Sequence, residues 1–245
     1  MHWEKNRIKQ TPNNLKVLSL STAEQGCSLA IIDGTNLVCE EYWLSRQTHS
    51  RRIIHMIEHM MAHRANLSMD EMDAFVVAKG PGSFTGLRIG ISVIKGLAYG
   101  LGKPAIGVSS LDGIAFQYAY SSIPVCVMMD ARRDEVYSAV YTFDNGRLVS
   151  KSREKVVSPD CALENGIGHV LYAGSGSVVY KDIIEQKADA PVFGNHLLSF
   201  VSAKALVQAL SVENDILKSS SDLLVPSYIR KSDAELQLDQ KLDQK

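Results

Sequence analysis

A run of histidines and one glutamate in the first third of the chain has the spacing of a metal site. His55, Glu58 and His59 fit the pattern His-x-x-Glu-His, and His63 follows one helical turn later. Two histidines four residues apart on one helix can bind zinc, with the glutamate acting beside the metal. The match leaves two positions unspecified, however, and no third ligand is identifiable. Zinc-peptidase activity is therefore the weakest alternative, and we expect no metal site and no catalytic residue.

A glycine-rich turn is the second candidate for chemistry. Residues 79–90 read Lys-Gly-Pro-Gly-Ser-Phe-Thr-Gly-Leu-Arg-Ile-Gly. Gly80 and Gly82 permit a tight turn, and Ser83 or Thr85 can cap a following helix. Amide groups at such a helix start can bind an anion, but the Gly-Lys-Ser/Thr ending of a phosphate-binding loop is absent. The sequence favours a structural turn and leaves phosphate binding as an alternative.

The helix predicted after this turn carries four glycines in two pairs. Gly86 and Gly90 form one pair, and Gly96 and Gly100 form the other, each with four-residue spacing. A glycine inside a helix costs about 0.5–1 kcal/mol relative to alanine, so this spacing requires a compensating contact. We predict that another backbone lies close to this glycine ladder. The sequence leaves open whether that backbone belongs to the chain's own sheet or to a helix of a second protein.

A helix predicted over residues 50–64 supplies an apolar face beside the ladder. Its members are Ile53, Ile54, Ile57, Met60 and Met61. Methionine adapts to the shape of a partner, so this face is a plausible helical docking surface. Packing in the chain's own core explains the same pattern equally well.

Composition and charge limit the partners of the chain. Its 245 residues include 26 Lys and Arg against 27 Asp and Glu, a formal net charge of −1, so no overall positive field attracts RNA. The four cysteines lie far apart, which indicates reduced thiols that serve as small apolar residues. The N-terminal segment is polar, and no apolar run has membrane-spanning length. We therefore expect a cytoplasmic protein without a membrane partner.

The elements that must position these residues follow one order twice. The first series comprises strands at 16–22, 28–33 and 37–44, the helix over 50–64, a strand at 74–78, the glycine-bearing helix, a strand at 105–108 and a helix from about 110. The second series comprises strands at 125–130 and 135–143, a third strand between 148 and 157, a weak helical or irregular stretch, a strand at 170–173, a helix over 178–186, a short strand at 192 and a helix over 199–210. Both series read βββαβαβα.

This repeat predicts the α/β fold class, with tandem βββαβαβα lobes. Three strands with short turns form an antiparallel meander, and the strand–helix alternation that follows gives parallel pairing. Such tandem lobes have the topology of the actin, Hsp70 and sugar-kinase superfold (ASKHA, ribonuclease H-like); an unrelated α/β protein of similar order is the alternative. We predict a disordered leader at 1–14, an N-terminal lobe with docking helices at 15–112, a C-terminal lobe at 113–225 and a tail at 226–245.

Several of these segments together resemble the TsaB (YeaZ) family of bacterial tRNA-modification proteins, formerly labelled M22 glycoprotease-like. The family's hallmark Gly-Pro-Gly-Ser-Phe-Thr-Gly-Leu-Arg-Ile-Gly is present in full at residues 80–90. Segments that agree in order are His-Ser-Arg-Arg at 49–52, Val-Ser-Ser-Leu at 108–111, Asp-Ala-Arg-Arg at 130–133 and Pro-x-Tyr-Ile-Arg at 226–230. The resemblance runs from about residue 16 to residue 235.

The resemblance implies a non-catalytic scaffold that binds and activates the related TsaD subunit, with the ATPase TsaE, for threonylcarbamoylation of adenosine next to the anticodon of tRNA. The isolated chain would hold no cofactor, because partner subunits would hold ATP and metal. It would meet tRNA only through the complex and would form a homodimer when TsaD is absent. A nucleotide-dependent enzyme of the superfold and an M22-type metallopeptidase are the alternatives.

The resemblance also assigns residues. Those expected to bind the partner are His49, Ser50, Ile53, Ile54, Ile57, Met60, Met61, Gly86, Arg88, Gly90 and Ile94. The signature loop comprises Gly80, Pro81, Gly82, Ser83, Phe84 and Thr85, and RNA or interlobe contacts are expected at Arg132, Arg133 and Arg230.

One departure from the family pattern concerns catalysis. Family members usually read Ile-Asp-Thr-Ser-Thr on the first strand, whereas residues 20–24 here read Leu-Ser-Thr-Ala-Glu. Kinases of the superfold use an aspartate at this place near metal-bound phosphates, and Ser21 cannot supply that charge. We therefore expect no independent ATP hydrolysis.

Overall fold

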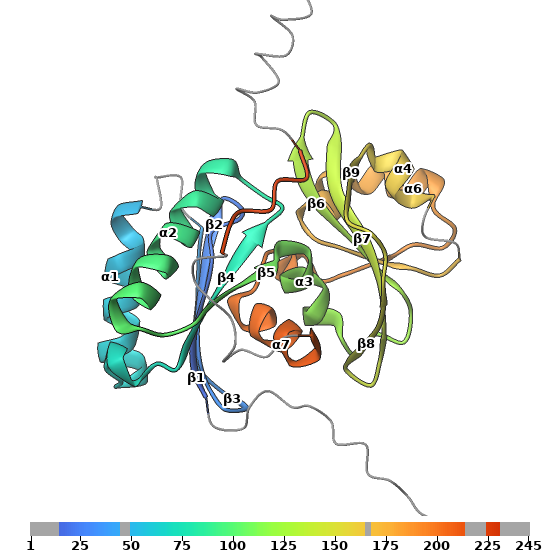
Figure 1. Cartoon of the computed structure of the whole chain (residues 1–245). Helices are drawn as coiled ribbons and strands as arrows, with labels where there is room; N and C mark the ends of the chain where they lie inside the picture. The colour runs from blue at the N-terminus through green and yellow to red at the C-terminus, as the bar shows by residue number, and fades with distance from the viewer. Residues whose placement is uncertain (1–14, 45–49, 165–167, 214–223, 231–245) are drawn as a thin grey trace, which may run out of the picture.

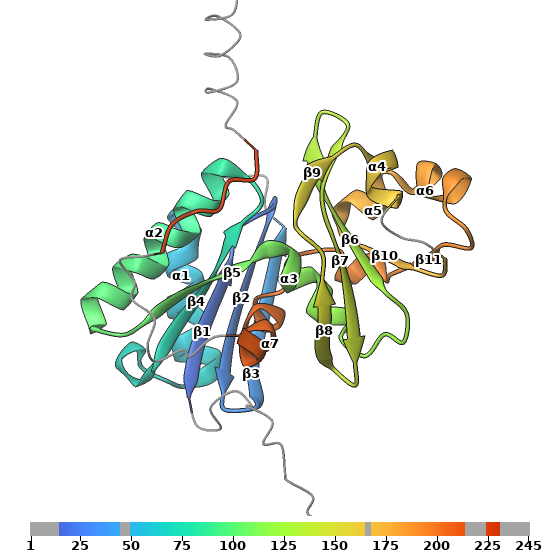
Figure 2. The ribbon, with the colours of Figure 1, turned by 45° about the vertical axis from the view of Figure 1, so that its right-hand side comes forward.

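The computed structural model describes residues 15–44, 50–164, 168–213 and 224–230. Two lobes, each built around one mixed β-sheet, lie side by side (Figures 1 and 2). The predicted leader at 1–14 and the predicted tail beyond residue 230 lie outside the described residues.

The first lobe contains a sheet with the strand order β3-β2-β1-β4-β5. Strand β1 pairs antiparallel with β2 and parallel with β4, as the meander and the strand–helix alternation predict. In chain order the elements are β1 (Lys16–Ser21), β2 (Gly26–Asp33), β3 (Asn36–Leu44), α1 (Ser50–Met60), the π-helical turn η1 (Met61–Ala65), the 3-10 turn η2 (Met69–Glu71), β4 (Ala74–Gly80), α2 (Phe84–Leu101), β5 (Ala105–Ser109) and α3 (Ser110–Ala115).

Both faces of this sheet are covered. Side chains alternate along β1, so Leu18 and Leu20 point to one face and Val17 to the other. Leu18 and Leu20 belong to a buried cluster with residues of α1 and α2, whereas Val17 belongs to a cluster with residues of α3 and α7. The sheet therefore fixes α1 and α2 on its outer face and leaves its inner face toward the second lobe (Figure 2).

The second lobe repeats the plan. Its sheet has the order β11-β10-β6-β7-β8, and β9 also pairs with β7. When the strands are numbered within their own series, this order is the same as that of the first lobe. In chain order the elements are the 3-10 turn η3 (Phe116–Tyr118), β6 (Val125–Arg132), β7 (Glu135–Asp144), β8 (Arg147–Lys151), β9 (Lys155–Val157), α4 (Pro159–Leu163), β10 (Leu171–Ala173), α5 (Ser175–Val179), α6 (Lys181–Lys187), β11 (Val192–Phe193), the 3-10 turn η4 (His196–Leu198) and α7 (Ala203–Glu213).

The tandem α/β superfold is confirmed by this matching topology, and the differences from the prediction are local. The strand predicted at 148–157 is two strands, β8 and β9. The helix predicted over 178–186 begins earlier, at Ser175, and is interrupted at Tyr180, whose φ of −105° and ψ of 28° are not helical. None of the described helices is both long and apolar enough to cross a membrane.

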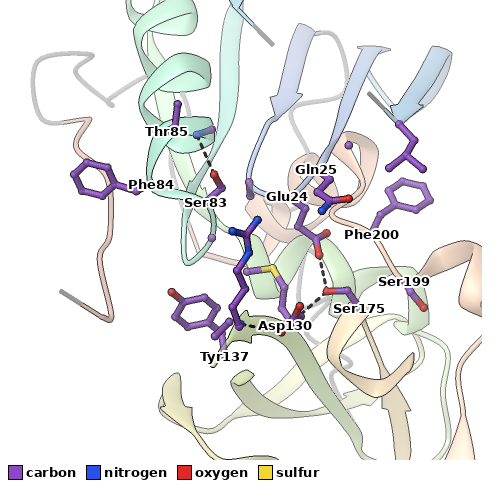
Figure 3. A pocket seen from close by; sticks show the side chains of 18 of the residues that line it. Glu24, Gln25, Ser83, Phe84, Thr85, Asp130, Tyr137, Ser175, Ser199 and Phe200 are labelled. Atoms are coloured by element: carbon purple, nitrogen blue, oxygen red, sulfur yellow. Dashed lines mark hydrogen bonds between the residues drawn. The ribbon is translucent and has the colours of Figure 1, made fainter. Parts of the chain in front are cut away.

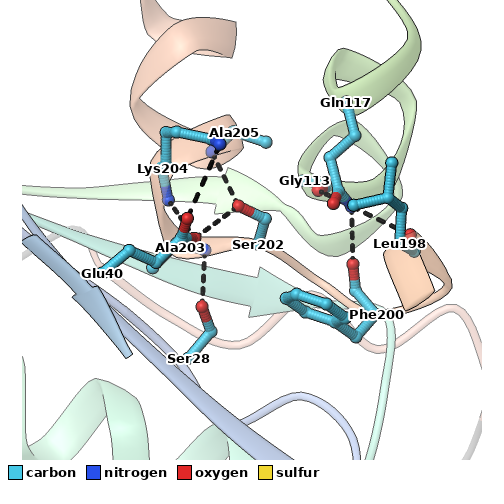
Figure 4. A network of polar contacts seen from close by, with 10 residues as sticks. All are labelled: Ser28, Glu40, Gly113, Gln117, Leu198, Phe200, Ser202, Ala203, Lys204 and Ala205. Atoms are coloured by element: carbon cyan, nitrogen blue, oxygen red, sulfur yellow. Dashed lines mark hydrogen bonds and ion pairs between the residues drawn. The ribbon is translucent and has the colours of Figure 1, made fainter. Parts of the chain in front are cut away.

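Helix α7 is the last helix among the described residues, but it packs on the first lobe. Its N-terminus is held by residues of β2 and β3: the Ala203 N–H donates to Ser28 Oγ (2.9 Å), and Ser202 Oγ donates to Glu40 Oε1 (2.7 Å) (Figure 4). Lys204 also pairs with Glu40, at 3.6 Å. Capping of a helix start by side chains satisfies amide groups that the helix itself leaves open. The first sheet thus depends on a segment about 170 residues further along the chain. The residue limits predicted for each lobe stay predictions.

The two lobes share one core. A single buried cluster includes Val76 and Ile106 of the first sheet, Ile114 of α3, and Val127 and Tyr141 of the second sheet. Because this apolar contact is continuous, the lobes meet along their base and leave a cleft above it.

Candidate functional site

A cleft of about 840 Å³ lies between the lobes. Figure 3 shows its walls, with the signature loop on one side and the end of β6 on the other. Its lining includes Glu24, Gln25 and Tyr42 from the meander, residues 82–86 from the signature loop and the start of α2, residues 129–132 from β6, and Ser175, Ser199 and Phe200. Because this cleft lies between the lobes and gathers polar side chains from both, we take it as the candidate site.

The signature loop is built for contacts within the chain. Ser83 caps α2 by accepting the Gly86 N–H, and the Ser83 N–H donates to the carbonyl of Ala23 (2.7 Å). A Cβ atom at Gly82 would collide with that same carbonyl oxygen. The loop is therefore closed against the β1–β2 turn, which supports the structural reading of its glycines.

The first pair of the glycine ladder also packs internally. A Cβ at Gly86 would collide with the Thr22 carbonyl oxygen, and one at Gly90 would collide with Thr22 Oγ1. Thr22 Oγ1 donates to the Gly86 carbonyl at 2.7 Å. The backbone that lies against Gly86 and Gly90 is thus the chain's own, directly after β1. This packing accounts for both glycines within the chain, and their assignment as partner-binding residues stays a prediction.

The second pair of the ladder is different. Nothing lies within 4 Å of a Cβ built at Gly96 or Gly100, and both residues are exposed on the outer side of α2. The half-buried side chains of Val93 and Leu97 flank them. Gly96 and Gly100 are therefore the two glycines of the ladder that remain accessible to a second protein.

The apolar face of α1 points mostly into the core. Ile53, Ile57, Met60 and Met61 are at most 4% exposed, and Ile94 of α2 is fully buried beside them. These five residues cover the outer face of the first sheet, which explains their apolar character within the chain, and their assignment as partner contacts stays a prediction. Ile54 is 41% exposed and Arg88 is exposed, so both remain available. His49 lies outside the described residues, and Ser50 begins α1.

Glu24 crosses the cleft at its base. It lies in the β1–β2 turn, yet its carboxylate accepts a hydrogen bond from Ser175 Oγ (2.7 Å; Figure 3). It accepts another from the Val201 N–H at 3.1 Å. Ser175 Oγ in turn accepts the Asp130 N–H at 3.1 Å. One side chain thus connects the first lobe to the turn after β10 and to the segment that enters α7.

The electrostatics of this carboxylate disfavour anions in the cleft. Burial raises the pKa of Glu24 above its usual 4.5, hydrogen bonds from Ser175 and Val201 partly offset the rise, and the charge of Asp130 adds to it. A phosphate group placed at this end of the cleft would face two carboxylates at close range, which costs energy in a desolvated site. Without a metal ion between them, these acidic side chains disfavour a phosphate at this end of the cleft.

Sequence reasoning missed Glu24. Its signal was present in the departure at residues 20–24, where glutamate stands in place of the family's last threonine. Ser21, the departure that drew attention, is 2% exposed and lies behind the cleft rather than on its surface.

The histidine run lies on the solvent side of α1. His55 Nδ1 is 3.3 Å from Glu58 Oε2, and the two side chains are 81% and 66% exposed. The rings of His59 and His63 are 4.9 Å apart. Within the described ranges no three histidine, cysteine or acidic side chains come together as a metal site would require. Cys27 and Cys126 lie in the core, as expected of small apolar residues, whereas Cys161 is exposed.

The three predicted arginines separate into two groups. Arg132 and Arg133 lie in the β6–β7 turn with φ of 60° and 55°, and Arg132 lines the cleft. Their contact with RNA stays a prediction. Arg230 instead bonds to the second lobe, because its Nη1 donates to the Ala131 carbonyl and pairs with Glu135 Oε2.

Comparison with known proteins identifies relatives along most of the chain. A family model described as "TsaD: tRNA N6-adenosine threonylcarbamoyltransferase" matches residues 43–238. The protein named tRNA threonylcarbamoyladenosine biosynthesis protein TsaB is 38% identical in Haemophilus influenzae, over 71% of this chain and 77% of that protein. The protein of the same name in Escherichia coli is 34% identical, over 69% of this chain and 75% of that protein. The Bacillus subtilis protein of this name is 27% identical over 90% of this chain and 96% of its own length.

Solved structures agree with the sequence relatives. The structure described as YeaZ from Pseudomonas aeruginosa superposes with a TM-score of 0.73 and 27% identity, covering 87% of this chain and 99% of that one. A second structure, described as an uncharacterized protein with similarity to peptidase YEAZ from the same organism, has the same TM-score and 25% identity, and it covers 88% of this chain and all of the other.

Proposed function

Because the chain belongs to the TsaB (YeaZ) family and so takes part in tRNA threonylcarbamoyladenosine biosynthesis, we propose that it acts there as a non-catalytic subunit that binds and activates TsaD. TsaD and TsaE supply the nucleotide and metal chemistry, and tRNA meets this chain only through the complex. The site of action is the cytoplasm, where the tRNA substrate is found.

The cleft supports the non-catalytic part of this proposal. By the family resemblance, Ser21 stands where kinases of the superfold have an aspartate, and serine cannot supply that charge. The space beside Gly82, Gly86 and Gly90 of the signature is filled by Thr22 and Ala23 of the same chain. These contacts use the loop for folding and leave no arrangement that would activate a phosphoryl group.

The outer side of α2 supports the binding part, and it is the observation on which the proposal depends. Gly96 and Gly100 lie inside or at the end of an 18-residue helix with open space above them. Each glycine lowers the stability of the helix by about 0.5–1 kcal/mol relative to alanine, and no contact within the described residues compensates for this loss. A helix of a second protein laid on this surface would approach the backbone of α2 closely.

The surroundings of these glycines suit a helical partner. On the same helix Val93 and Leu97 are half-buried and Tyr99 is 84% exposed. Partly exposed apolar and aromatic side chains around a close approach are typical of the centre of an interface. The same surface on a second copy of the chain would pair by a two-fold axis, which accounts for a homodimer in the absence of TsaD.

Replacing Gly96 by leucine tests this docking surface. Because nothing lies within 4 Å of the new Cβ, Gly96→Leu should fold normally. The added side chain should hold the partner helix away and weaken TsaD binding by about tenfold or more, since interface cores tolerate added volume poorly. The measurement is calorimetric titration of the purified chain with TsaD of the same organism, together with tRNA modification by the reconstituted complex.

A matched control separates this effect from added surface hydrophobicity. Gln186 of α6 is exposed on the second lobe, so Gln186→Leu should leave TsaD binding unchanged. Wild-type affinity in a folded Gly96→Leu variant would remove α2 from the interface. ATP hydrolysis or proteolysis by the chain without TsaD would contradict the non-catalytic role.

A further inference from the structure

The segment 224–230, here called the strap, crosses from the first lobe to the second. Figures 1 and 2 draw it in red as it runs past α2 toward β6. Its first residue is anchored in the first lobe: the Leu224 side chain is 6% exposed in the core under α1 and α2, and Lys95 Nζ donates to its carbonyl at 3.4 Å.

The strap next fills a space left by the signature loop. The Ser227 N–H donates to the Lys79 carbonyl at 2.7 Å. Gly80, with φ of +119°, lies directly beneath, and a Cβ there would collide with the Ser227 carbonyl oxygen. The first glycine of the signature therefore gives room to the strap, in addition to permitting the turn.

Aromatic contacts extend this anchor over the start of α2. The rings of Tyr228 and Phe84 stack with centroids 4.7 Å apart. Arg88 Nε donates to Tyr228 Oη at 3.1 Å, and the Arg88 guanidinium lies 3.8 Å from the Phe84 ring centre. Stacked aromatic pairs and cation–π contacts add to the stability that area burial gives.

The far end of the strap is anchored on the second lobe. Arg230 Nη1 donates to the Ala131 carbonyl at 3.0 Å and lies 2.9 Å from Glu135 Oε2. The Arg230 side chain is only 14% exposed. Charge-assisted bonds of a mostly buried arginine are stronger than those of exposed pairs.

We propose that the strap is an interlobe clamp that sets how far the cleft opens. Its two anchors lie on opposite walls of the cleft, because Phe84 and Ala131 both line it. The shared core and Glu24 join the lobes at their base, whereas the strap joins them at the rim. The two rims of the cleft, at residues 82–86 and 129–132, can separate only if the strap detaches from one wall.

Replacing Arg230 by methionine tests the clamp in the full chain without any partner. Met keeps much of the side-chain length but removes both polar contacts to the second lobe. Arg230→Met should make amide hydrogen exchange about tenfold faster in both rims, at residues 82–86 and 129–132, since lost charged hydrogen bonds favour local opening. Exchange within β4 should stay unchanged. Arg147→Met, an exposed arginine on β8, is the control and should alter neither rim.

A second variant keeps the test decisive if Arg230→Met is poorly folded. Glu135→Gln removes the ion pair but leaves the bond to the Ala131 carbonyl, so both rims should exchange faster by a smaller factor. Faster exchange of residues 224–230 with no change at either rim, in either variant, would show that the strap is not a clamp. Because the measurement uses the chain alone, its result is independent of TsaD binding.

Discussion

At the scale of single residues, Glu24 decides which ligands the cleft can accept. Its carboxylate is desolvated, it faces Asp130, and its hydrogen-bond donors are an uncharged hydroxyl and a backbone amide. The raised pKa follows from that environment. The same contacts that join the lobes therefore make the cleft unfavourable for phosphate.

Glu24 should give the chain a pH-dependent stability that a glutamine lacks. Its folded pKa is raised above the usual 4.5, so the unfolded chain binds fewer protons than the folded chain between the two values. The stability of the wild type relative to Glu24→Gln should therefore be greatest below the usual carboxyl pKa, and should fall as pH rises through the raised value. Urea unfolding of both proteins from about pH 4 to about pH 8 measures the difference.

A control for this prediction replaces a carboxylate at the surface. Asp189 is exposed, and Asp189→Asn should show no such trend. A stability difference between wild type and Glu24→Gln that is constant across the pH range would mean that the carboxylate is well solvated.

At the scale of elements, α2 uses its glycines for two opposite purposes. Gly86 and Gly90 bring the helix against Thr22, whereas Gly96 and Gly100 face open space. The helix is thus fixed to the sheet by its N-terminal half and presents its C-terminal half outward.

Alanine substitutions should separate the two halves of α2. Gly90→Ala should destabilise the protein by about 1–3 kcal/mol, because the new Cβ collides with Thr22 Oγ1 in a packed core. Gly96→Ala should stabilise it by about 0.5–1 kcal/mol, since the helix gains a better helix former without a clash. Thermal and denaturant unfolding measure both.

Thr22→Ala provides the partner variant for this test. It removes Thr22 Oγ1, the atom with which the new Cβ of Gly90→Ala would collide. The double variant should therefore lose less stability than the sum of the losses of the two single variants. Additive losses would place the strain elsewhere in α2.

The elements themselves could largely be predicted from local sequence. Asn145 and Gly146 adopt φ of 48° and 82°, as their turn signal predicts, and Ser83 and Gly102 begin and end α2 by their ordinary capping preferences. The site could not be predicted in this way. The donors to Glu24 lie 151 and 177 residues further along the chain, and helical periodicity alone does not say whether Ile53 or Gly90 faces a sheet or a partner.

At the scale of the whole molecule, the lobes are joined through α3, α7 and the cluster that spans both sheets. Glu40 of β3 holds the start of α7 through Ser202 and Lys204. The two lobes therefore depend on each other for stability, although each has its own sheet.

This dependence predicts a single unfolding transition. Amides of β1 and of β6 should exchange with the same free energy of opening and the same dependence on urea. Glu40→Ala should lower both values equally, by about 1–2 kcal/mol, because it removes a buried cap of α7. Exchange from β6 at a lower free energy, with its own urea dependence, would show that the second lobe unfolds alone.

The position of α7 also has a consequence for biosynthesis. A ribosome releases the strands of the first sheet early, but residues 203–213, which complete its inner face, are synthesised about 170 residues after β2. Long sequence separation between contacting segments slows folding and leaves apolar surface uncovered meanwhile. The nascent first lobe therefore keeps apolar surface uncovered until α7 has been synthesised.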